Sequence, residues 1–280
     1  MADAPIISIA DLTVTYAGAA TAALRGVDLE LLAGEAVGIV GLNGAGKTTL
    51  ALTLNGVIPQ LVPADVGGRI TVDGQDPTRT PVRDTARTVG MVFDTPEYQL
   101  SQPTVAEELA LGLEGLAVAT EEMPARIDAA LDAVGLAGFH DRSPLALSGG
   151  QQQRVAIAAV LAMEPRVLVM DEPTSNLDPA GTADVFAIAR DLVRERGMTV
   201  IVAEHDVESL AAFADRIVVL DAGRVVLQGT PAEVFGAVDT LRALGLRSPQ
   251  VTDLAHTVAP DSAPLPVTLD EAVTWLGTRR

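Results

Sequence analysis

The eight residues Gly41–Thr48, GLNGAGKT, constrain the fold of this chain more than any other segment. They follow the apolar run Ala36–Val40 and lead into Thr49–Leu54, so the predicted order is strand, glycine turn and helix. Glycines at a helix start let backbone N–H groups converge on an anion. The lysine can reach the β- and γ-phosphates and the next hydroxyl can bind Mg²⁺, so a nucleoside triphosphate site is predicted rather than an ordinary glycine turn. The residues expected to bind the nucleotide here are Asn43, Gly44, Ala45, Gly46, Lys47, Thr48 and Thr49, with Mg²⁺ on Thr48.

The composition is that of an acidic globular protein. Of 280 residues, 48% are hydrophobic, and 19 Lys plus Arg against 37 Asp plus Glu give a formal net charge of −18. Because phosphate contacts need a basic face, this charge argues against nucleic acid as a partner. The chain has no cysteine, which excludes disulfides and cysteine-ligated metal sites.

The sequence predicts no membrane segment. Its start, Met1–Pro5, lacks the basic and apolar regions of a signal peptide. The most apolar internal runs, such as Val155–Met163, are far shorter than the ~20 residues that a membrane span requires. We therefore expect a protein that does not cross a bilayer by itself but is able to dock on one that does.

The pattern along the chain predicts strands around the phosphate loop and helices in the middle. Alternating apolar residues predict strands at 6–16 and 23–31, and a short strand at 69–72 is expected after a loop at 59–68. Thr104 with Glu107 has the spacing of a capping box. After about Phe235 the pattern loosens, except before a last helix. The expected domains are an ATP-binding core at 1–97 and 163–235, an inserted helical subdomain at 98–162 and a C-terminal extension at 236–280.

Two carboxylates end the apolar run Val167–Met170. In enzymes with this phosphate loop, such a strand lies beside the loop, so Asp171 is expected to hold Mg²⁺. Glu172 is then placed to accept a proton from the attacking water. The alternative is that the pair marks only a solvated turn.

A second glycine pair opens a helix in the segment Leu147-Ser148-Gly149-Gly150-Gln151. Ser148 and Gln151 have the spacing of a capping box, which explains the segment as a plain helix start. The functional interpretation is a second anion site at a helix N-terminus, away from the first. The spacing alone does not say whose phosphate it binds.

These segments resemble, in kind and order, the motifs of ATP-binding-cassette (ABC) ATPases. The resemblance implies an α/β fold with a P-loop NTPase (RecA-like) core, an N-terminal antiparallel β subdomain, an inserted α-helical subdomain and a small C-terminal extension. It also implies a head-to-tail dimer in which each ATP lies between one subunit's phosphate loop and the other's Ser148, Gly149, Gly150 and Gln151. The resembling segments, within about residues 6 to 235, are Gly41–Thr48, Leu147–Gln151, Val167–Glu172, Ser175–Asp178 and His205.

The resemblance also implies roles for three single residues. Tyr16 is similar to the aromatic residue that stacks on adenine, although a half-buried strand aromatic is the plainer alternative. His205 matches the histidine that contacts the γ-phosphate, whereas a lone histidine after a strand is usually structural. Asp178 matches the aspartate of the loop that couples the two ATP sites.

A finer resemblance rests on Val89–Leu100, on Thr104–Glu114 and on tail segments such as Leu244–Leu246. These segments resemble the ATPase subunits of energy-coupling factor (ECF) transporters, which import vitamins and transition-metal ions. It implies an identical or paralogous second ATPase subunit, a transmembrane coupling subunit and a substrate-binding membrane subunit. The expected location is peripheral, on the cytoplasmic face of the cell membrane. The solute is not encoded here, because a separate membrane subunit selects it.

One position departs from the family pattern. The family has glutamine after Val-Phe, and this chain has Asp94. Ionised aspartate only accepts hydrogen bonds, yet it is able to ligate Mg²⁺. We therefore expect Asp94 as a catalytic and metal-binding residue that leaves nucleotide binding intact and puts the turnover rate in question. The rival functions are a slowly hydrolysing partner of an active paralogue, which Asp94 favours, and a non-transport ABC ATPase, which the acidic charge disfavours.

Overall fold

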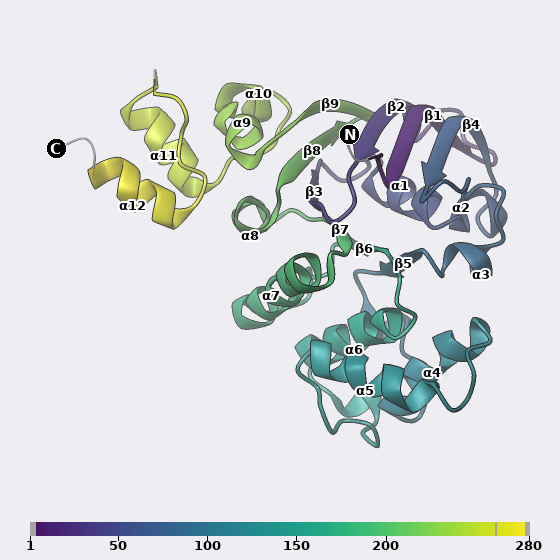
Figure 1. Ribbon diagram of the computed structural model, residues 1–280. Helices are drawn as coiled ribbons and strands as arrows, with labels where there is room; N and C mark the ends of the chain where they lie inside the picture. The colour runs from purple at the N-terminus through teal and green to yellow at the C-terminus, as the bar shows by residue number, and fades with distance from the viewer. Residues whose placement is uncertain (1–3, 261, 278–280) are drawn as a thin grey trace.

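A six-stranded sheet forms the centre of the computed structural model, which describes residues 4–260 and 262–277 (Figure 1). All neighbouring strands are parallel except the last pair, which forms a hairpin around residues 221–223. In spatial order the strands are β5 (Val89–Val92), β6 (Val167–Asp171), β7 (Thr199–Ala203), β3 (Ala36–Val40), β8 (Arg216–Asp221) and β9 (Arg224–Gly229). The first four are buried at every residue, as expected for parallel strands covered on both faces.

Alternate residues of these strands enter two separate cores. In β6, Leu168 and Met170 belong to the core that the helices 105–161 and 179–213 share. Val167 and Val169 belong to a second core, which lies under a separate, smaller sheet of three strands near the N-terminus. The strand period of two therefore holds helices on one face and the N-terminal sheet, with the phosphate-loop helix, on the other.

The smaller sheet is antiparallel, with the order β2 (Leu24–Leu31), β1 (Ile7–Tyr16) and β4 (Ala64–Val72). The predicted loop at 59–68 is wrong over its second half, because β4 already begins at Ala64. Residues Ala64–Gly67 pair with Thr13–Tyr16 of β1. Two glycines and exposed side chains hide this part of the strand from a hydrophobic pattern, since only the backbone pairing defines it.

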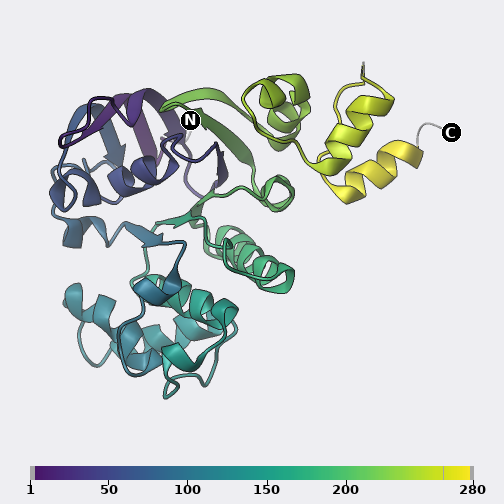
Figure 2. The ribbon, with the colours of Figure 1, turned by 180° about the vertical axis from the view of Figure 1, so that it is seen from behind.

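The predicted helical insertion lies at the opposite end of the central sheet from the smaller sheet, as Figures 1 and 2 show from two sides. Its helices are α4 (Val105–Gly115), α5 (Met123–Ala133) and α6 (Gly149–Leu161), with short 3₁₀ turns η1 (Pro96–Tyr98) and η2 (Pro144–Ala146). Both predicted capping boxes, at Thr104 and at Ser148, are present. Leu109, Leu113 and Leu131 are fully buried between these helices.

The remaining helices cover the core and form the tail. On the core lie α1 (Lys47–Leu54), α2 (Val57–Gln60), α3 (Val82–Thr85), α7 (Pro179–Arg196) and α8 (Val207–Phe213). The tail is more regular than the loosened pattern suggests, with α9 (Pro231–Gly236), α10 (Val238–Ala243), α11 (Gln250–Val258) and α12 (Leu269–Gly277). The last of these, α12, is the helix that the sequence predicts at the end of the chain, and none of its residues is buried.

The predicted fold class is confirmed: a P-loop α/β core, an N-terminal antiparallel sheet, inserted helices and a C-terminal extension. The domain boundaries at 97/98, 162/163 and 235/236 stay a prediction.

Candidate active site

The phosphate loop joins β3 to α1 as the sequence predicts. Gly44 and Gly46 have positive φ angles of 80° and 111°. A Cβ on Gly46 would lie 2.8 Å from Leu24 Cδ2 and 3.0 Å from the Ala23 carbonyl oxygen, so only glycine fits this close approach to β2. No side chain caps the start of α1, and its first turn carries no acidic residue. The first backbone N–H groups of the helix therefore face the loop ready for an anion.

A cavity of about 330 Å³ lies over this loop. Tyr16 lines it, and its hydroxyl lies 2.9 Å from Thr49 Oγ1. Tyr16 is half-buried against the core under the smaller sheet, so part of its ring has a structural contact as well as a face on the cavity. Glu172 lines the cavity as well. Every residue from Asn43 to Thr49 lines this cavity.

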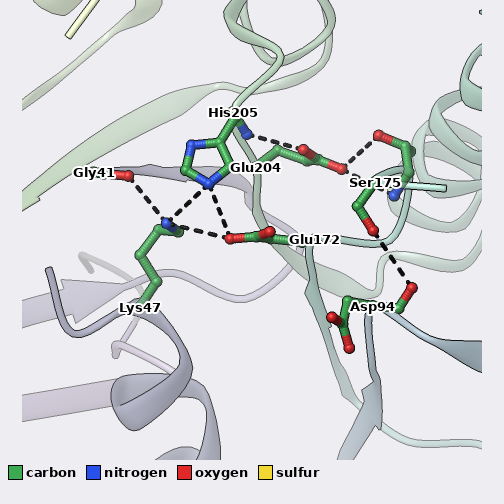
Figure 3. A network of polar contacts seen from close by, with 8 residues as sticks. Gly41, Lys47, Asp94, Glu172, Ser175, Glu204 and His205 are labelled. Atoms are coloured by element: carbon green, nitrogen blue, oxygen red, sulfur yellow. Dashed lines mark hydrogen bonds and ion pairs between the residues drawn. The ribbon is translucent and has the colours of Figure 1, made fainter. Parts of the chain in front are cut away.

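Three charged or titratable side chains from separate loops meet at the phosphate loop. Lys47, 5% exposed, donates from Nζ to the Gly41 carbonyl oxygen at 3.0 Å. The same Nζ lies 3.4 Å from Glu172 Oε1 and 3.4 Å from His205 Nε2. His205 Nε2 lies 3.0 Å from Glu172 Oε1, which closes a triangle (Figure 3). The predicted lysine, base and histidine are thus brought together.

Glu172 stands in a conformation that side chains rarely adopt, with φ 49°. Its N–H donates to the Ala203 carbonyl oxygen at 2.8 Å, which continues the β6–β7 pairing by one residue. Such left-handed residues persist only where the surroundings hold them, and they gather at functional sites. The strained turn directs the carboxylate back toward Lys47 instead of along the strand.

Asp171 is buried at the end of β6 beside the phosphate loop. Burial raises the pKa of Asp171, and the charges of Glu172 and Asp94 raise this pKa further, while a hydrogen bond with Thr48 and the charge of Lys47 oppose the rise. Its Oδ1 is buried and has no hydrogen-bond partner. A buried, unsatisfied carboxylate oxygen next to a hydroxyl is the donor set that a hard divalent cation takes. Thr48 and Asp171 therefore fit Mg²⁺.

Asp94 lies at the edge of the site and joins it through its backbone. Its carbonyl oxygen accepts from Asn176 Nδ2 at 3.4 Å and from Ser175 Oγ at 3.5 Å. In Figure 3 no contact is drawn to its carboxylate. That carboxylate is close enough to Asp171 to raise its pKa. Gln99 does not replace it, because Gln99 Oε1 accepts from the Phe93 N–H at 3.0 Å.

The helix start at Ser148–Gln151 lies apart from the phosphate loop of the same chain. The Gln151 N–H donates to Ser148 Oγ at 3.4 Å, and the Ser148 N–H donates to Gln151 Oε1 at 3.1 Å. Ser148 and Gly149 are exposed, and none of Ser148, Gly149, Gly150 and Gln151 lines the phosphate-loop cavity. Gly149 borders a second cavity of about 320 Å³ together with Asp94. The structure thus shows the capping role of Ser148 and Gln151. If this helix start binds a phosphate, that phosphate is not one held in the phosphate-loop cavity of the same chain.

Two acidic residues near the site, the predicted Asp178 and the unpredicted Glu204, hold backbone groups in place. Asp178 caps α7, since its Oδ1 accepts from the Gly181 N–H at 2.7 Å. Glu204, buried next to His205, accepts hydrogen bonds from two loops of the site. Sequence reasoning missed Glu204, although its signal, a carboxylate directly after the buried strand β7, was the same as that of Glu172 after β6.

Comparisons with known proteins show which proteins this chain resembles. A family model described as "ABC transporter" matches residues 24–175. The chain is 46% identical over 258 residues to the energy-coupling factor transporter ATP-binding protein EcfA1 of Symbiobacterium thermophilum, covering 90% of this chain and 87% of that protein. It is 41% identical over 253 residues to EcfA of Methanothermobacter thermautotrophicus, covering 90% of this chain and 79% of that protein. It also spans 45% of a longer relative from Methanosarcina mazei, at 39% identity.

Solved structures show the same fold. The structure of cbiO1 from Clostridium perfringens, described as part of the ABC transporter complex cbiONQ, superposes with a TM-score of 0.76 at 35% identity and covers 90% of this chain and 99% of its own. A dimeric ATP-binding cassette in a post-hydrolysis state with ADP and phosphate superposes with a TM-score of 0.69 at 29% identity, covering 80% of this chain and 98% of its own. Among the residues that the structure describes, no helix combines the length and apolar character needed to span a membrane.

Proposed function

Because the chain belongs to the ABC transporter family and is an ATPase subunit of a transporter, we propose that it energises an energy-coupling factor importer. The importer type is supported by the similarity to EcfA1 and to cbiO1 over about nine-tenths of the chain. The solute class that goes with this type is a vitamin or a transition-metal ion. The work of the chain is then to convert nucleotide-dependent closure and reopening into movement of a membrane subunit.

The observation that carries the hydrolytic role is the triangle of Lys47, Glu172 and His205. Lys47 is held by the Gly41 carbonyl oxygen and presents its charge to the phosphates that the loop would bind. Glu172 is the general base, since its carboxylate borders the cavity and is able to accept a proton from a water beside the γ-phosphate. His205 Nε2 orients that carboxylate in the absence of nucleotide and contacts the γ-phosphate when ATP is present.

Thr48 and Asp171 are the proposed Mg²⁺ residues, with Asp94 as a further oxygen donor at the edge of the site. The cation would neutralise phosphate charge that develops during phosphoryl transfer. The Asp171 carboxylate suits this cation because it is buried, hydrogen-bonded to Thr48 and unsatisfied at Oδ1.

The proposed site is completed by a second subunit. Ser148 and Gly149 are exposed at a helix start, and none of Ser148, Gly149, Gly150 and Gln151 lines the phosphate-loop cavity of its own chain. A head-to-tail pair would place this start over the partner's phosphate loop, and a relative of the same fold is itself described as dimeric. Asp178, at the start of α7, is the proposed link between the two ATP sites.

The membrane partners are proposed to dock on the loop 94–102, at the cytoplasmic face of the cell membrane. Tyr98 on η1 is 90% exposed, and Asp94 and Glu97 line the cavity beside it. An exposed aromatic side chain beside two carboxylates fits a helix that presents apolar and basic residues. The acidic charge of the whole chain, −18, suits the same kind of partner and disfavours nucleic acid.

Replacing Glu172 by glutamine tests the hydrolytic role. The variant should bind Mg²⁺-ATP, lose phosphate release and accumulate as a closed dimer in size-exclusion chromatography with ATP. The matched control is Glu114→Gln, an exposed carboxylate on α4, which should behave as wild type. Undiminished phosphate release by Glu172→Gln would refute the assignment.

A second candidate is a slowly hydrolysing subunit paired with an active paralogue. The observation that favours it is Asp94, whose charge adds to those of Asp171 and Glu172 near the phosphates. Turnover by the isolated chain, compared with that of the chain mixed with a co-purified paralogue, separates the two candidates.

A further inference from the structure

One buried carboxylate ties together two of the loops that carry the active site. Glu204 lies at the end of β7 and is 4% exposed. Its Oε1 accepts from the Thr174 N–H at 2.9 Å and from Thr174 Oγ1 at 2.5 Å. Its Oε2 accepts from the His205 N–H at 2.9 Å. The two oxygens of one side chain thus serve two different loops, as Figure 3 shows.

Each of these loops carries a residue of the proposed hydrolytic triangle. Thr174 follows Glu172 by two positions on the loop after β6, and His205 is the next residue after Glu204 itself. The backbone of Glu204 is fixed as well, because its N–H donates to the Ile39 carbonyl oxygen of β3 at 3.2 Å. The carboxylate therefore lies at the junction of β3, β6 and β7, where the loops leave the sheet.

The turn at Glu172 needs such a contact. With φ 49°, Glu172 does not hold its conformation by intrinsic preference, so neighbouring bonds must hold it. The N–H of Glu172 is paired with β7, and Thr174, two residues later, is paired with Glu204. The strained residue Glu172 therefore lies between two hydrogen-bonded backbone positions, its own N–H and that of Thr174.

We propose that Glu204 is a positioning residue for ATP hydrolysis, which sets the Glu172 carboxylate relative to His205 through its hydrogen bonds to both loops. The inference rests on the proposed function, in which Glu172 is the base. Glutamate suits this position because each of its two oxygens accepts. Glutamine has the same shape, but its NH₂ group would face the N–H of one of the two loops, so it is able to hold one loop and not both.

The same loop continues the connection toward the proposed docking segment. Ser175 and Asn176, the next residues after Thr174, donate to the Asp94 carbonyl oxygen. Displacement of Asp94 by a docked partner would thus act on the loop that Glu204 holds. Glu204 fixes this loop at its end nearer the phosphate loop.

Glu204→Gln is the test, assayed with Mg²⁺-ATP on the purified full chain. A misplacement of a catalytic group by about 1 Å lowers rates on the order of 100-fold, so kcat should fall about 10- to 100-fold. The Kd for ATP should stay within about twofold of wild type, because the phosphate loop is untouched. Thr174→Val, which removes the hydroxyl and keeps the N–H, should give a smaller fall in kcat.

Glu108→Gln is the matched control. Glu108 is also a buried carboxylate, 5% exposed, whose Oε2 accepts from the Ser101 and Gln102 N–H groups at 2.7 and 2.8 Å, far from the triangle. It should lose a similar amount of thermal stability and keep its kcat in the isolated chain. An equal fall of kcat in both variants, or a proportional loss of ATP affinity in Glu204→Gln, would show that Glu204 is only structural.

The double variant separates this inference from the proposed function. If Glu204 acts through Glu172, single-turnover hydrolysis by Glu172→Gln should not fall further when Glu204→Gln is added. Full hydrolysis by Glu172→Gln alone would overturn the proposed function, and with it the group through which Glu204 acts. Loss of hydrolysis in Glu172→Gln with a wild-type rate in Glu204→Gln would overturn only the positioning role.

Discussion

Replacing Asp171 by asparagine should stabilise the nucleotide-free protein while it weakens the proposed Mg²⁺ site. In the free protein the Asp171 carboxylate is buried, and its Oδ1 has no hydrogen-bond partner. An unsatisfied buried acceptor costs about 1–3 kcal/mol, and more when it is charged. Asparagine keeps an oxygen for Thr48 and places its NH₂ group where Oδ1 lies, so the gain comes from removing the buried charge, and the attraction of Lys47 is lost with it.

The net gain in the free energy of unfolding should be about 1 kcal/mol, which corresponds to about 2 °C in Tm for a chain of this size. Its pH dependence has a definite sign. Burial raises the pKa of Asp171 above its ordinary value, so the folded state holds this proton more tightly than the unfolded state. The ionised group therefore destabilises the fold above the raised pKa, and this destabilisation disappears as pH falls toward the unfolded value. The advantage of Asp171→Asn should shrink accordingly between pH 7 and acid pH.

Mg²⁺-ATP should reverse the order of stability, so that the wild type becomes more stable than Asp171→Asn. A ligand at 100 times its Kd stabilises a folded protein by about 2.7 kcal/mol, and the wild type should gain this from Mg²⁺-ATP whereas the variant should gain less. Thermal melts without ligand, with Mg²⁺-ATP, and at two pH values measure all of this, with the exposed Asp132→Asn as control. A nucleotide-free variant less stable than wild type, or an equal gain with Mg²⁺-ATP, would refute the reasoning.

Three further predictions concern the helix start at Ser148, the substitution of the family's glutamine by Asp94, and the packing of Gly90 in the core. Ser148→Arg should abolish hydrolysis and leave ATP binding nearly intact, and a mixture with Lys47→Ala should regain one complete site per dimer if the chain pairs with itself; equal loss of ATP affinity in Ser148→Arg would contradict a role in trans. Asp94→Gln should raise turnover in the isolated chain by about tenfold, because ~1.4 kcal/mol of relieved repulsion is enough for that change; steady-state assays at saturating Mg²⁺ decide it, and an unchanged rate would speak against repulsion. Gly90→Ala should lower the free energy of unfolding by about 1–3 kcal/mol, since its Cβ would lie 2.1 Å from Val160 Cγ1; denaturant titration measures this, and wild-type stability would show that the helix α6 yields.

The sequence was sufficient for the parts of the site that depend on local order. The phosphate loop, the strand before Asp171 and the helix start at Ser148 are each defined by a few consecutive residues whose chemistry and backbone needs agree. The roles assigned to these residues remain proposals. Their placement beside one another follows from the parallel strands, since β3, β6 and β7 all end at the same edge.

What the sequence left open depends on partners distant in the chain. The first half of β4 is a strand only because β1 pairs with it, and its glycines and exposed residues carry no apolar alternation. The helices α10 and α11 lie in a stretch that we expected to be irregular, where each is too short for a clear period. Glu204 was overlooked because a buried carboxylate gains its meaning from Thr174, thirty positions earlier.

The even burial of the central strands has a consequence for how the molecule moves. Every residue of β3, β5, β6 and β7 is buried, whereas the loops at their ends expose Ser175, Asn176 and Asp178 and are joined mainly by polar contacts. Opening these loops exposes little apolar surface, so it requires far less free energy than opening the central sheet. Backbone amides of the central strands should therefore exchange with solvent more slowly than those of the loops at the strand ends. Movement at the site would then come from these loops, with the central sheet as the fixed frame against which they move.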